Sequence, residues 1–411
     1  MQPSIPTARN LPSLTGLRFA AAFGVWLSHA AFLHPAVWGP VLPLLIQLGP
    51  AGVSLFFVLS GFVLTRSARP DDTARAFWRR RAVKIYPSHL TAWAAVTALT
   101  VAAGTVGALS VADFLPGLVL VQTWAPAAGP LMAGNIIAWS LCCEVFFYVL
   151  FPLLLRLVNR VPERRLTAAV VVVAGLVWAC PALSYVFTGP RLTGFPLDLP
   201  FTQVWFAYFF PPCRLPEFVL GMLLAAQLRS GARPRRSGVC AAAALLLGAL
   251  VVGARFLPVA CSFAATGVIA TALLVRATAA SDLRGSRCVL RSRTMVFLGE
   301  ISYAFYLTHT CALLAVDQGA RFVGHERSVP LIMACGLAAS ILLAWLLHST
   351  VEEPCMRRFA KPGAYRGRHL EPAPAAAPAP VAAPATAPVA APAPAPAPAP
   401  EQSDDQKKLM P

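Results

Sequence analysis

The chain has 411 residues, of which 57% are hydrophobic and only 12% are charged, with a formal net charge of +17. A soluble domain carries about twice that charged fraction, so the composition excludes an ordinary soluble protein. Apolar runs of about 20 residues recur along most of the length, which predicts an all-α integral membrane protein with about ten transmembrane helices. A β-barrel would instead show alternation in segments of about ten residues.

The membrane spans are expected near residues 14–34, 48–66, 86–108, 136–155, 167–187, 211–228, 238–256, 258–279, 296–318 and 329–350. With the N-terminus inside, most of the 34 Lys and Arg residues fall in cytosolic segments. This asymmetry follows the positive-inside rule and predicts a multi-pass membrane protein with both termini in the cytosol. The positive charge is therefore explained by the orientation of the chain in the membrane, and no nucleic acid is expected as a partner.

One membrane domain is expected over residues 10–360, followed by a disordered cytosolic tail over residues 361–411. From Glu371 to Pro400 the tail is a Pro-Ala repeat, which favours an extended, solvated backbone without a core.

Two polar residues interrupt the first span, Arg18 and His29. A charge at the bilayer centre costs roughly 2.5–3.5 kcal/mol even on mild scales, so such residues usually face a cavity and act there. Eleven helical positions separate the two, or about 16 Å. We expect Arg18 near one membrane face and His29 well toward the other.

Four further ionisable groups lie inside apolar spans, Glu144, Arg214, Glu217 and His309. With the orientation above, they and His29 fall in the outer half of the bilayer. The sequence therefore predicts that two histidines and two carboxylates converge on one wet cavity. A neutral histidine there accepts a proton from a hydroxyl, and a carboxylate fixes its tautomer.

Basic residues gather at the cytosolic face, where Arg66 ends the second span and Arg79, Arg80 and Arg81 precede the third. Guanidinium groups match phosphate oxygens bidentately, so this cluster is suited to a phosphate-bearing donor. Topology signal and lipid contact are the simpler interpretation of the same residues.

Each membrane-embedded residue also has a structural interpretation. His309 and Glu144 are suited to an interhelical hydrogen bond, and His29 to a packing role. The ten cysteines show no CxxC pair and are expected to fill space. A zinc site from His29, His309 and Glu144 is disfavoured because no short-range ligand pair anchors it, so no metal is expected.

Several ordered motifs resemble the membrane acyltransferase family 3 over about residues 11–360. They are Leu-x-Gly-Leu-Arg18 with ten residues to His29, the stretch Gly52 to Phe62, Phe77-x-x-Arg80-Arg81, Trp139-Ser-Leu-x-x-Glu144-x-x-Phe-Tyr148, Gly299-x-Ile-Ser-Tyr303-x-x-Tyr306-Leu-x-His309, and Glu353-x-x-Met356. The chain departs from the pattern at Val145, where many members have a second Glu, and at Ser54, where Asp is common. The chain is expected to lack the fused esterase-like domain of some members and is similar to stand-alone, actinomycete types, which implies a location in the bacterial inner membrane.

The resemblance implies transfer of an acyl group, often acetyl, from acyl-CoA as a co-substrate to a hydroxyl, with no permanently bound cofactor. Acceptors implied by the family are cell-surface carbohydrates, glycolipids and metabolites such as macrolides. The Arg18–His29 pair corresponds to the pair essential in the family, and Arg66 matches its Gly-Phe-x-x-x-Arg motif.

The catalytic residues are therefore expected to be His29, Arg18, Glu144 and His309. His29 would act as a general base or carry the acyl group, Glu144 or Glu217 would orient a histidine, and Arg18 would stabilise developing charge. Donor binding is expected from Arg66, Arg79, Arg80 and Arg81, and substrate binding from Tyr148, Arg214, Glu217, Tyr303 and Tyr306.

Two other classes stay open at this point. A proton-coupled transporter would use the intramembrane His and Glu residues as a relay, but no internal repeat of paired broken helices is visible. A non-catalytic scaffold predicts that Arg18 and His29 affect stability alone.

Overall fold

A computed structural model describes residues 11–69, 72–102, 104, 109–191, 199–229, 238–263, 265–324 and 328–360. Within these residues the chain is helical apart from turns, loops and one isolated bridge between Arg191 and Pro200. The predicted all-α membrane class is confirmed. The predicted tail, residues 361–411, lies outside the described residues.

The helices follow one another in this order: α1 (Pro12–Leu33), α2 (Pro35–Trp38), η1 (Gly39–Val41), α3 (Leu42–Ser67), α4 (Ala74–Ala102), α5 (Val111–Leu118), α6 (Ala128–Met132), η2 (Ile136–Ala138), α7 (Trp139–Arg160), η3 (Glu163–Arg165), α8 (Leu166–Ser184), α9 (Phe201–Val204), η4 (Trp205–Phe209), α10 (Pro211–Arg229), α11 (Val239–Phe256), α12 (Val259–Ser262), α13 (Val268–Leu283), η5 (Val289–Arg291), α14 (Arg293–Glu300), α15 (Ser302–Phe322), α16 (Val329–Leu347), η6 (His348–Glu352) and α17 (Glu353–Phe359).

Eight of the ten predicted spans each overlap one long helix, whereas span 258–279 is divided between α12 and α13 and span 296–318 between α14 and α15. Seven helical stretches of the described chain are long and apolar enough to cross a membrane. These seven contain α1, α3, α7, α8, α10, α11 and α16. Of the remaining three, α13 has only 16 residues. The other two, α4 and α15, carry polar side chains within their apolar stretches, which lowers their mean hydropathy.

The third span differs most from its prediction. The sequence places its start at residue 86, whereas α4 begins at Ala74. The intervening residues are good helix formers without a breaker, so the helix runs through them. Arg79, Arg80 and Arg81 therefore lie on a helix and point in different directions, about 100° apart, so they do not all face one ligand.

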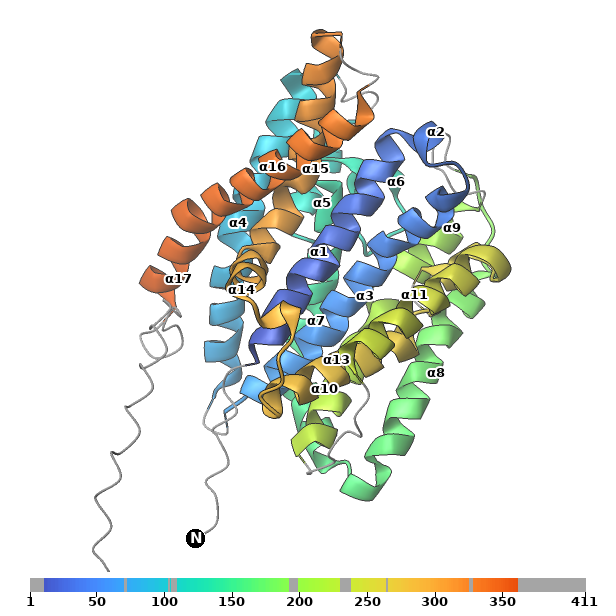
Figure 1. The fold of residues 1–411 in the computed structure, drawn as a ribbon, viewed down its shortest axis with the longest axis vertical. Helices are drawn as coiled ribbons and strands as arrows, with labels where there is room; N and C mark the ends of the chain where they lie inside the picture. Colours follow the sequence, from blue (N-terminus) through green and yellow to red (C-terminus); the bar gives the residue numbers. More distant parts are fainter. Residues whose placement is uncertain are drawn as a thin grey trace, which may run out of the picture. The chain divides into compact units, whose positions relative to one another are not determined.

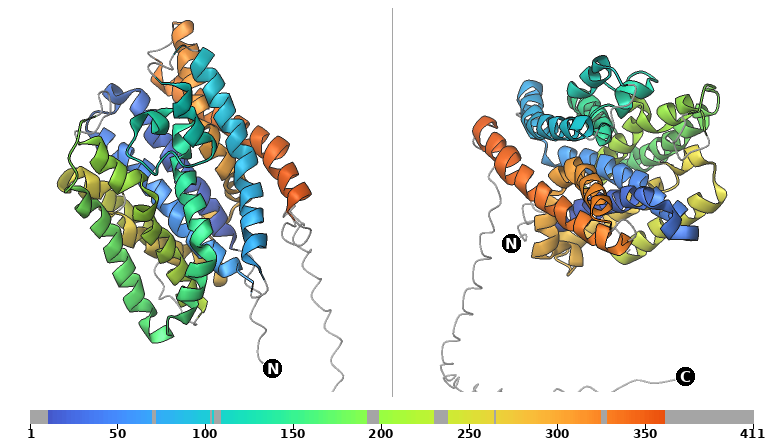
Figure 2. Two further views of the ribbon diagram at one scale, coloured as in Figure 1. Left: turned by 180° about the vertical axis from the view of Figure 1, so that it is seen from behind. Right: turned by 90° about the horizontal axis from the view of Figure 1, so that it is seen from above.

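Helix α1 occupies the interior of the helical assembly. It contacts α3, α13, α14 and α15, which come from both halves of the chain (Figure 1). Seen along the helices, α1 lies among the other elements, whereas α8 and α11 lie at the periphery (Figure 2). Only 17% of the spans containing α8 and α11 is buried, against 56% for α1. Polar residues on α1 are therefore surrounded by protein on most sides.

Two glycines bring α3 and α10 into close contact. A Cβ added at Gly61 would lie 1.9 Å from the carbonyl oxygen of Phe218, and one at Gly221 would lie 2.0 Å from that of Val58. Small residues allow membrane helices to approach backbone to backbone. This contact holds α10, whose span is 72% buried, against the middle of α3.

Candidate active site

A cavity of about 140 Å³ lies between α1, α3, α4, α7 and α15; we call it the central cavity. Its polar lining comes from five helices distant in sequence: Arg18, Ser60, Arg81, Lys84, Ser140, Glu144, Tyr148, Tyr303 and Tyr306. Apolar side chains of α3, such as Val53 and Phe56, complete the wall. A volume of this size holds a few water molecules or one slender chain.

Positive charge exceeds negative charge in the central cavity. Arg18, Arg81 and Lys84 line the cavity with one carboxylate, Glu144, and Lys84 is also ion-paired with Glu352 outside the lining, so these five side chains carry a formal charge of +1. The four side chains of the lining are half-buried. Because water is scarce at this depth, the surplus charge favours an anionic or strongly polarised ligand.

A hydrogen-bonded chain orders Glu144. The Tyr148 hydroxyl donates to Glu144 Oε2 at 3.1 Å and lies 3.1 Å from Ser60 Oγ. Four residues separate Glu144 from Tyr148, so both lie on one face of α7. The Arg81 guanidinium lies 5.9 Å from the centre of the Tyr148 ring. Glu144 is thus held toward the cations of the central cavity.

Lys84 connects the central cavity to the last helices. It forms an ion pair with Glu352, which is 1% exposed, and its Nζ lies 5.4 Å from the centre of the Tyr303 ring. Glu352 Oε2 also lies 3.3 Å from His348 Nδ1. A buried carboxylate without a partner would be costly, so the ion pair with Glu352 restrains the position of the Lys84 ammonium group.

A second cavity, of about 260 Å³, is lined by Ser67, Arg69, Asp72, Arg80 and Arg81, together with apolar residues that include Leu64, Phe77 and Phe151. Leu64 and Arg81 line both cavities, so the two adjoin at these side chains. Arg80 forms an ion pair with Asp72. The second cavity lies toward the ends of α3 and α4 that the sequence assigns to the cytosol.

Two of the predicted donor-binding residues lie elsewhere. Arg79 is exposed, and neither it nor Arg66 belongs to the lining of the two cavities. The position of Arg79 follows from helix geometry, since it lies two residues before Arg81 and therefore projects from a different face of α4.

His29 and His309 form a pair across α1 and α15. His309 Nε2 lies 3.2 Å from His29 Nδ1, and the ring centres are 5.1 Å apart. His309 is fully buried, whereas His29 is half-buried. The sequence separates these residues by 280 positions. Neither belongs to the lining of the central cavity, but Tyr306, which does, lies next to His309 with its ring centre 5.9 Å away.

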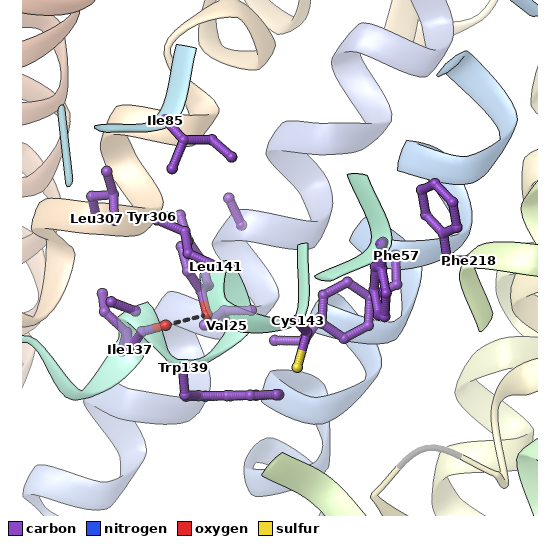
Figure 3. Packing of buried hydrophobic residues seen from close by; sticks show 14 of the residues in the cluster. Val25, Phe57, Ile85, Ile137, Trp139, Leu141, Cys143, Phe218, Tyr306 and Leu307 are labelled. Atoms are coloured by element: carbon purple, nitrogen blue, oxygen red, sulfur yellow. Dashed lines mark hydrogen bonds between the residues drawn. The ribbon is translucent and has the colours of Figure 1, made fainter. Parts of the chain in front are cut away.

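Tyr306 links the central cavity to the histidine pair. Its hydroxyl donates to the Ile137 carbonyl at 3.1 Å (Figure 3) and accepts from Ser140 Oγ at 2.8 Å. The ring lies 5.9 Å from that of His309, and the Tyr306 carbonyl oxygen lies 2.7 Å from His309 Nδ1. One residue therefore forms part of the cavity wall and holds the buried histidine.

Arg214 and Glu217 form a separate ion pair. Arg214 Nη2 lies 2.9 Å from Glu217 Oε2 and donates to Ser54 Oγ at 3.1 Å. The exposed fractions are 0% and 1%, and the Phe57, Trp139 and Tyr208 rings surround the guanidinium within about 6 Å. We call this arrangement the sealed ion pair.

The predicted convergence of the ionisable groups on one cavity is therefore wrong. Glu144 lies with Arg18, Arg81 and Lys84, while Glu217 pairs with Arg214. Neither carboxylate is hydrogen-bonded to a histidine of the pair, so neither can orient it as expected. No group of three or more His, Cys, Asp or Glu residues in the described ranges is placed to hold a metal ion.

The sequence analysis does not single out five residues of these cavities and their partners: Ser60, Arg69, Lys84, Ser140 and Glu352. Lys84 lies three residues after Arg81, so helix periodicity places both on one face of α4. Ser60 lies within the motif stretch Gly52 to Phe62, where nothing in the sequence distinguishes it from its neighbours. Glu352 is recognisable only because the fold places it beside Lys84.

Comparison with known proteins shows the family to which the chain belongs. A family model described as an acyltransferase domain matches residues 11–349. The chain is 40% identical to the acyltransferase MdmB of Streptomyces mycarofaciens over 367 residues, covering 86% of this chain and 93% of that protein. It is 26% identical to the exopolysaccharide production protein ExoZ of Rhizobium meliloti, covering 76% and 90% of the two chains.

A third relative is longer than this chain. The O-acetyltransferase OatA of Staphylococcus aureus is 26% identical over 234 residues, which cover 53% of this chain and 34% of OatA. No solved structure matches the chain significantly. The ordered motifs, the multi-pass helical fold and the match over most of the length agree: the chain belongs to the membrane acyltransferase family 3 and is an acyltransferase.

Proposed function

We propose that this protein transfers an acyl group, acetyl in the first instance, from acyl-CoA to a hydroxyl of a carbohydrate or a secondary metabolite. The observation that carries the proposal is the positively charged central cavity, which adjoins a second basic cavity at Arg81. This succession of cations suits a donor with phosphates at one end and a thioester at the end of a thin arm.

In this proposal the phosphates of the donor bind Arg69, Arg80 and Arg81, with the nucleotide on the cytosolic side. The pantetheine arm enters the central cavity, where about 140 Å³ admits a chain and excludes a bulky group. Arg18 and Lys84 stand beside the thioester carbonyl. A cation there stabilises the oxyanion that forms as the carbonyl is attacked.

The acceptor hydroxyl meets the thioester near Tyr306, on the side of the histidine pair. His29 Nε2 takes the hydroxyl proton while the oxygen attacks the carbonyl carbon. The carbon–sulfur bond then breaks, and the CoA thiolate accepts this proton from the His29 imidazolium. The products are the ester and free CoA thiol.

The proposal is tested by acyl-CoA-dependent release of free thiol in membranes that contain the protein and an extract of candidate acceptors. We expect His29→Ala to abolish release and Arg81→Gln to raise the KM for acyl-CoA at least tenfold. Arg79→Gln is the matched control, because this arginine lies two residues away and is exposed.

An equal rise in the KM for acyl-CoA in Arg79→Gln and Arg81→Gln would contradict donor binding in the two cavities. Thiol release by the His29→Ala variant would remove this histidine from the mechanism. A wild-type protein without any thiol release would exclude acyl-CoA as the donor.

The acceptor class is identified by comparing a deletion strain with its parent by mass spectrometry. Loss of an acetyl mass from surface glycans supports a carbohydrate acceptor, and loss from a secreted metabolite supports a metabolite. An unchanged mass in both fractions contradicts the proposed acceptors.

A further inference from the structure

The histidine pair shows which ring nitrogen each proton occupies. His309 Nδ1 lies 2.7 Å from the Tyr306 carbonyl oxygen, which only accepts hydrogen bonds. Nδ1 of His309 must therefore carry a proton. In a neutral ring the other nitrogen, Nε2, then presents a lone pair.

His29 is constrained in the same way. Its Nδ1 lies 3.0 Å from the Val25 carbonyl oxygen and 3.2 Å from His309 Nε2. Both neighbours are acceptors, so His29 Nδ1 carries a proton that they share. No hydrogen bond to another described residue engages His29 Nε2. This atom is the one nitrogen of the pair left to act as a base.

A carboxylate usually holds such a histidine, but three buried or half-buried carboxylates of the surrounding helices have other partners. Glu144 binds Tyr148, Glu217 binds Arg214, and Asp317 on α15 binds His34 at 3.0 Å and Arg321 at 3.0 Å. His309 lies among Phe305, Tyr306 and His29 and is fully buried. A neutral acceptor at this depth avoids the cost of an additional buried charge.

We propose that His309 is a positioning residue that holds His29 in the Nδ1-protonated tautomer and accepts a stronger hydrogen bond when His29 becomes positively charged. This role rests on the proposed function. The hydroxyl proton moves to His29 Nε2 while the Nδ1 proton stays in place. In the second transfer the Nε2 proton moves from His29 to the CoA thiolate. The hydrogen bond to the Tyr306 carbonyl keeps the His309 ring in the same orientation during both transfers.

Three substitutions of His309 separate this role from packing. Gln places an amide group near the position of Nε2 and can accept from His29. Asn places its amide near Nδ1, where it can satisfy the Tyr306 carbonyl without reaching His29. Phe keeps the flat ring that stacks on Phe305, whose centre lies 6.0 Å away at 13°, and removes both nitrogens.

The measurement is kcat and KM for acetyl-CoA in the thiol-release assay, with folded yield followed by size-exclusion chromatography. We expect Gln to keep kcat within about tenfold of wild type. Asn and Phe should each lose about 100-fold or more in kcat, the lower range for loss of a general base. KM for acetyl-CoA should stay unchanged in all three, because His309 lies outside both cavities.

Equal kcat for the Gln and Asn variants, at equal folded yield, would overturn the positioning role. So would wild-type kcat in the Phe variant. A His29→Ala variant that still turns over contradicts the proposed function itself, whatever His309 does. The two failures are therefore distinguishable in one assay.

Discussion

The central cavity and the sealed ion pair both place arginine and glutamate inside the membrane domain, yet their surroundings are opposite. Arg18, Arg81 and Lys84 outnumber Glu144 and remain half-buried around an open volume. Arg214 and Glu217 match one to one and are closed in by aromatic rings. Unbalanced, accessible charge indicates a ligand, whereas balanced, enclosed charge indicates structure.

The largest expected effect comes from breaking the sealed ion pair. Arg214→Ala leaves Glu217 charged and unpartnered, which costs about 3–5 kcal/mol. We expect little folded protein by size-exclusion chromatography in detergent. The double variant Arg214→Met, Glu217→Leu removes both charges and should recover folding together with activity. A folded but inactive double variant would show that the pair belongs to the chemistry.

The next effect concerns the central cavity. Arg18→Gln removes a cation beside the proposed thioester and should lower kcat about 100-fold, as removal of one oxyanion donor does. Folded yield should not change, since glutamine leaves no unpaired charge. Arg75→Gln, on the exposed start of α4, is the matched control. A loss of folded protein without a change in kcat would place Arg18 with the structural pair instead.

Glu352 is an intermediate case, because it is buried while its partner Lys84 faces the central cavity. Glu352→Gln should lower the free energy of unfolding by about 1.5–3 kcal/mol, the range for a hydrogen bond to a charged group. The adjacent Glu353 pairs with Arg357 on the surface, so Glu353→Gln should change stability by less than about 0.5 kcal/mol. Thermal unfolding in detergent measures both. Equal shifts in the two variants contradict a buried role for Glu352.

The smallest effect is expected at Ser60. Ser60→Ala removes one hydrogen bond to the Tyr148 hydroxyl, which still donates to Glu144 at 3.1 Å. A neutral bond contributes about 0.5–1.5 kcal/mol, so KM for acyl-CoA should rise about two- to tenfold. Ser349→Ala is the control, since Ser349 Oγ donates to the Leu346 carbonyl of its own helical segment at 3.2 Å and lines neither cavity. A loss above about 100-fold would mean that Ser60 contacts substrate directly.

Much of this protein follows from local sequence. Apolar runs predicted the helical membrane class, because a span needs about 20 apolar residues whatever lies around it. The cost of charge in the membrane singled out Arg18, His29, Glu144 and His309 one by one. Ordered motifs predicted the family, which the comparisons confirm.

Partnership among these residues was decided by the tertiary structure. Depth along a helix can be counted from the sequence, but the direction of a side chain depends on how the helix rotates against its neighbours. The contact of His29 with His309 spans 280 positions, and the assignment of Glu144 to Arg18, Arg81 and Lys84 depends on how α1, α4 and α7 pack. By contrast, Arg214 and Glu217 lie three residues apart on α10, so helix geometry alone makes them neighbours. Composition and spacing hold no information on that rotation, because packing of side chains from distant segments sets it.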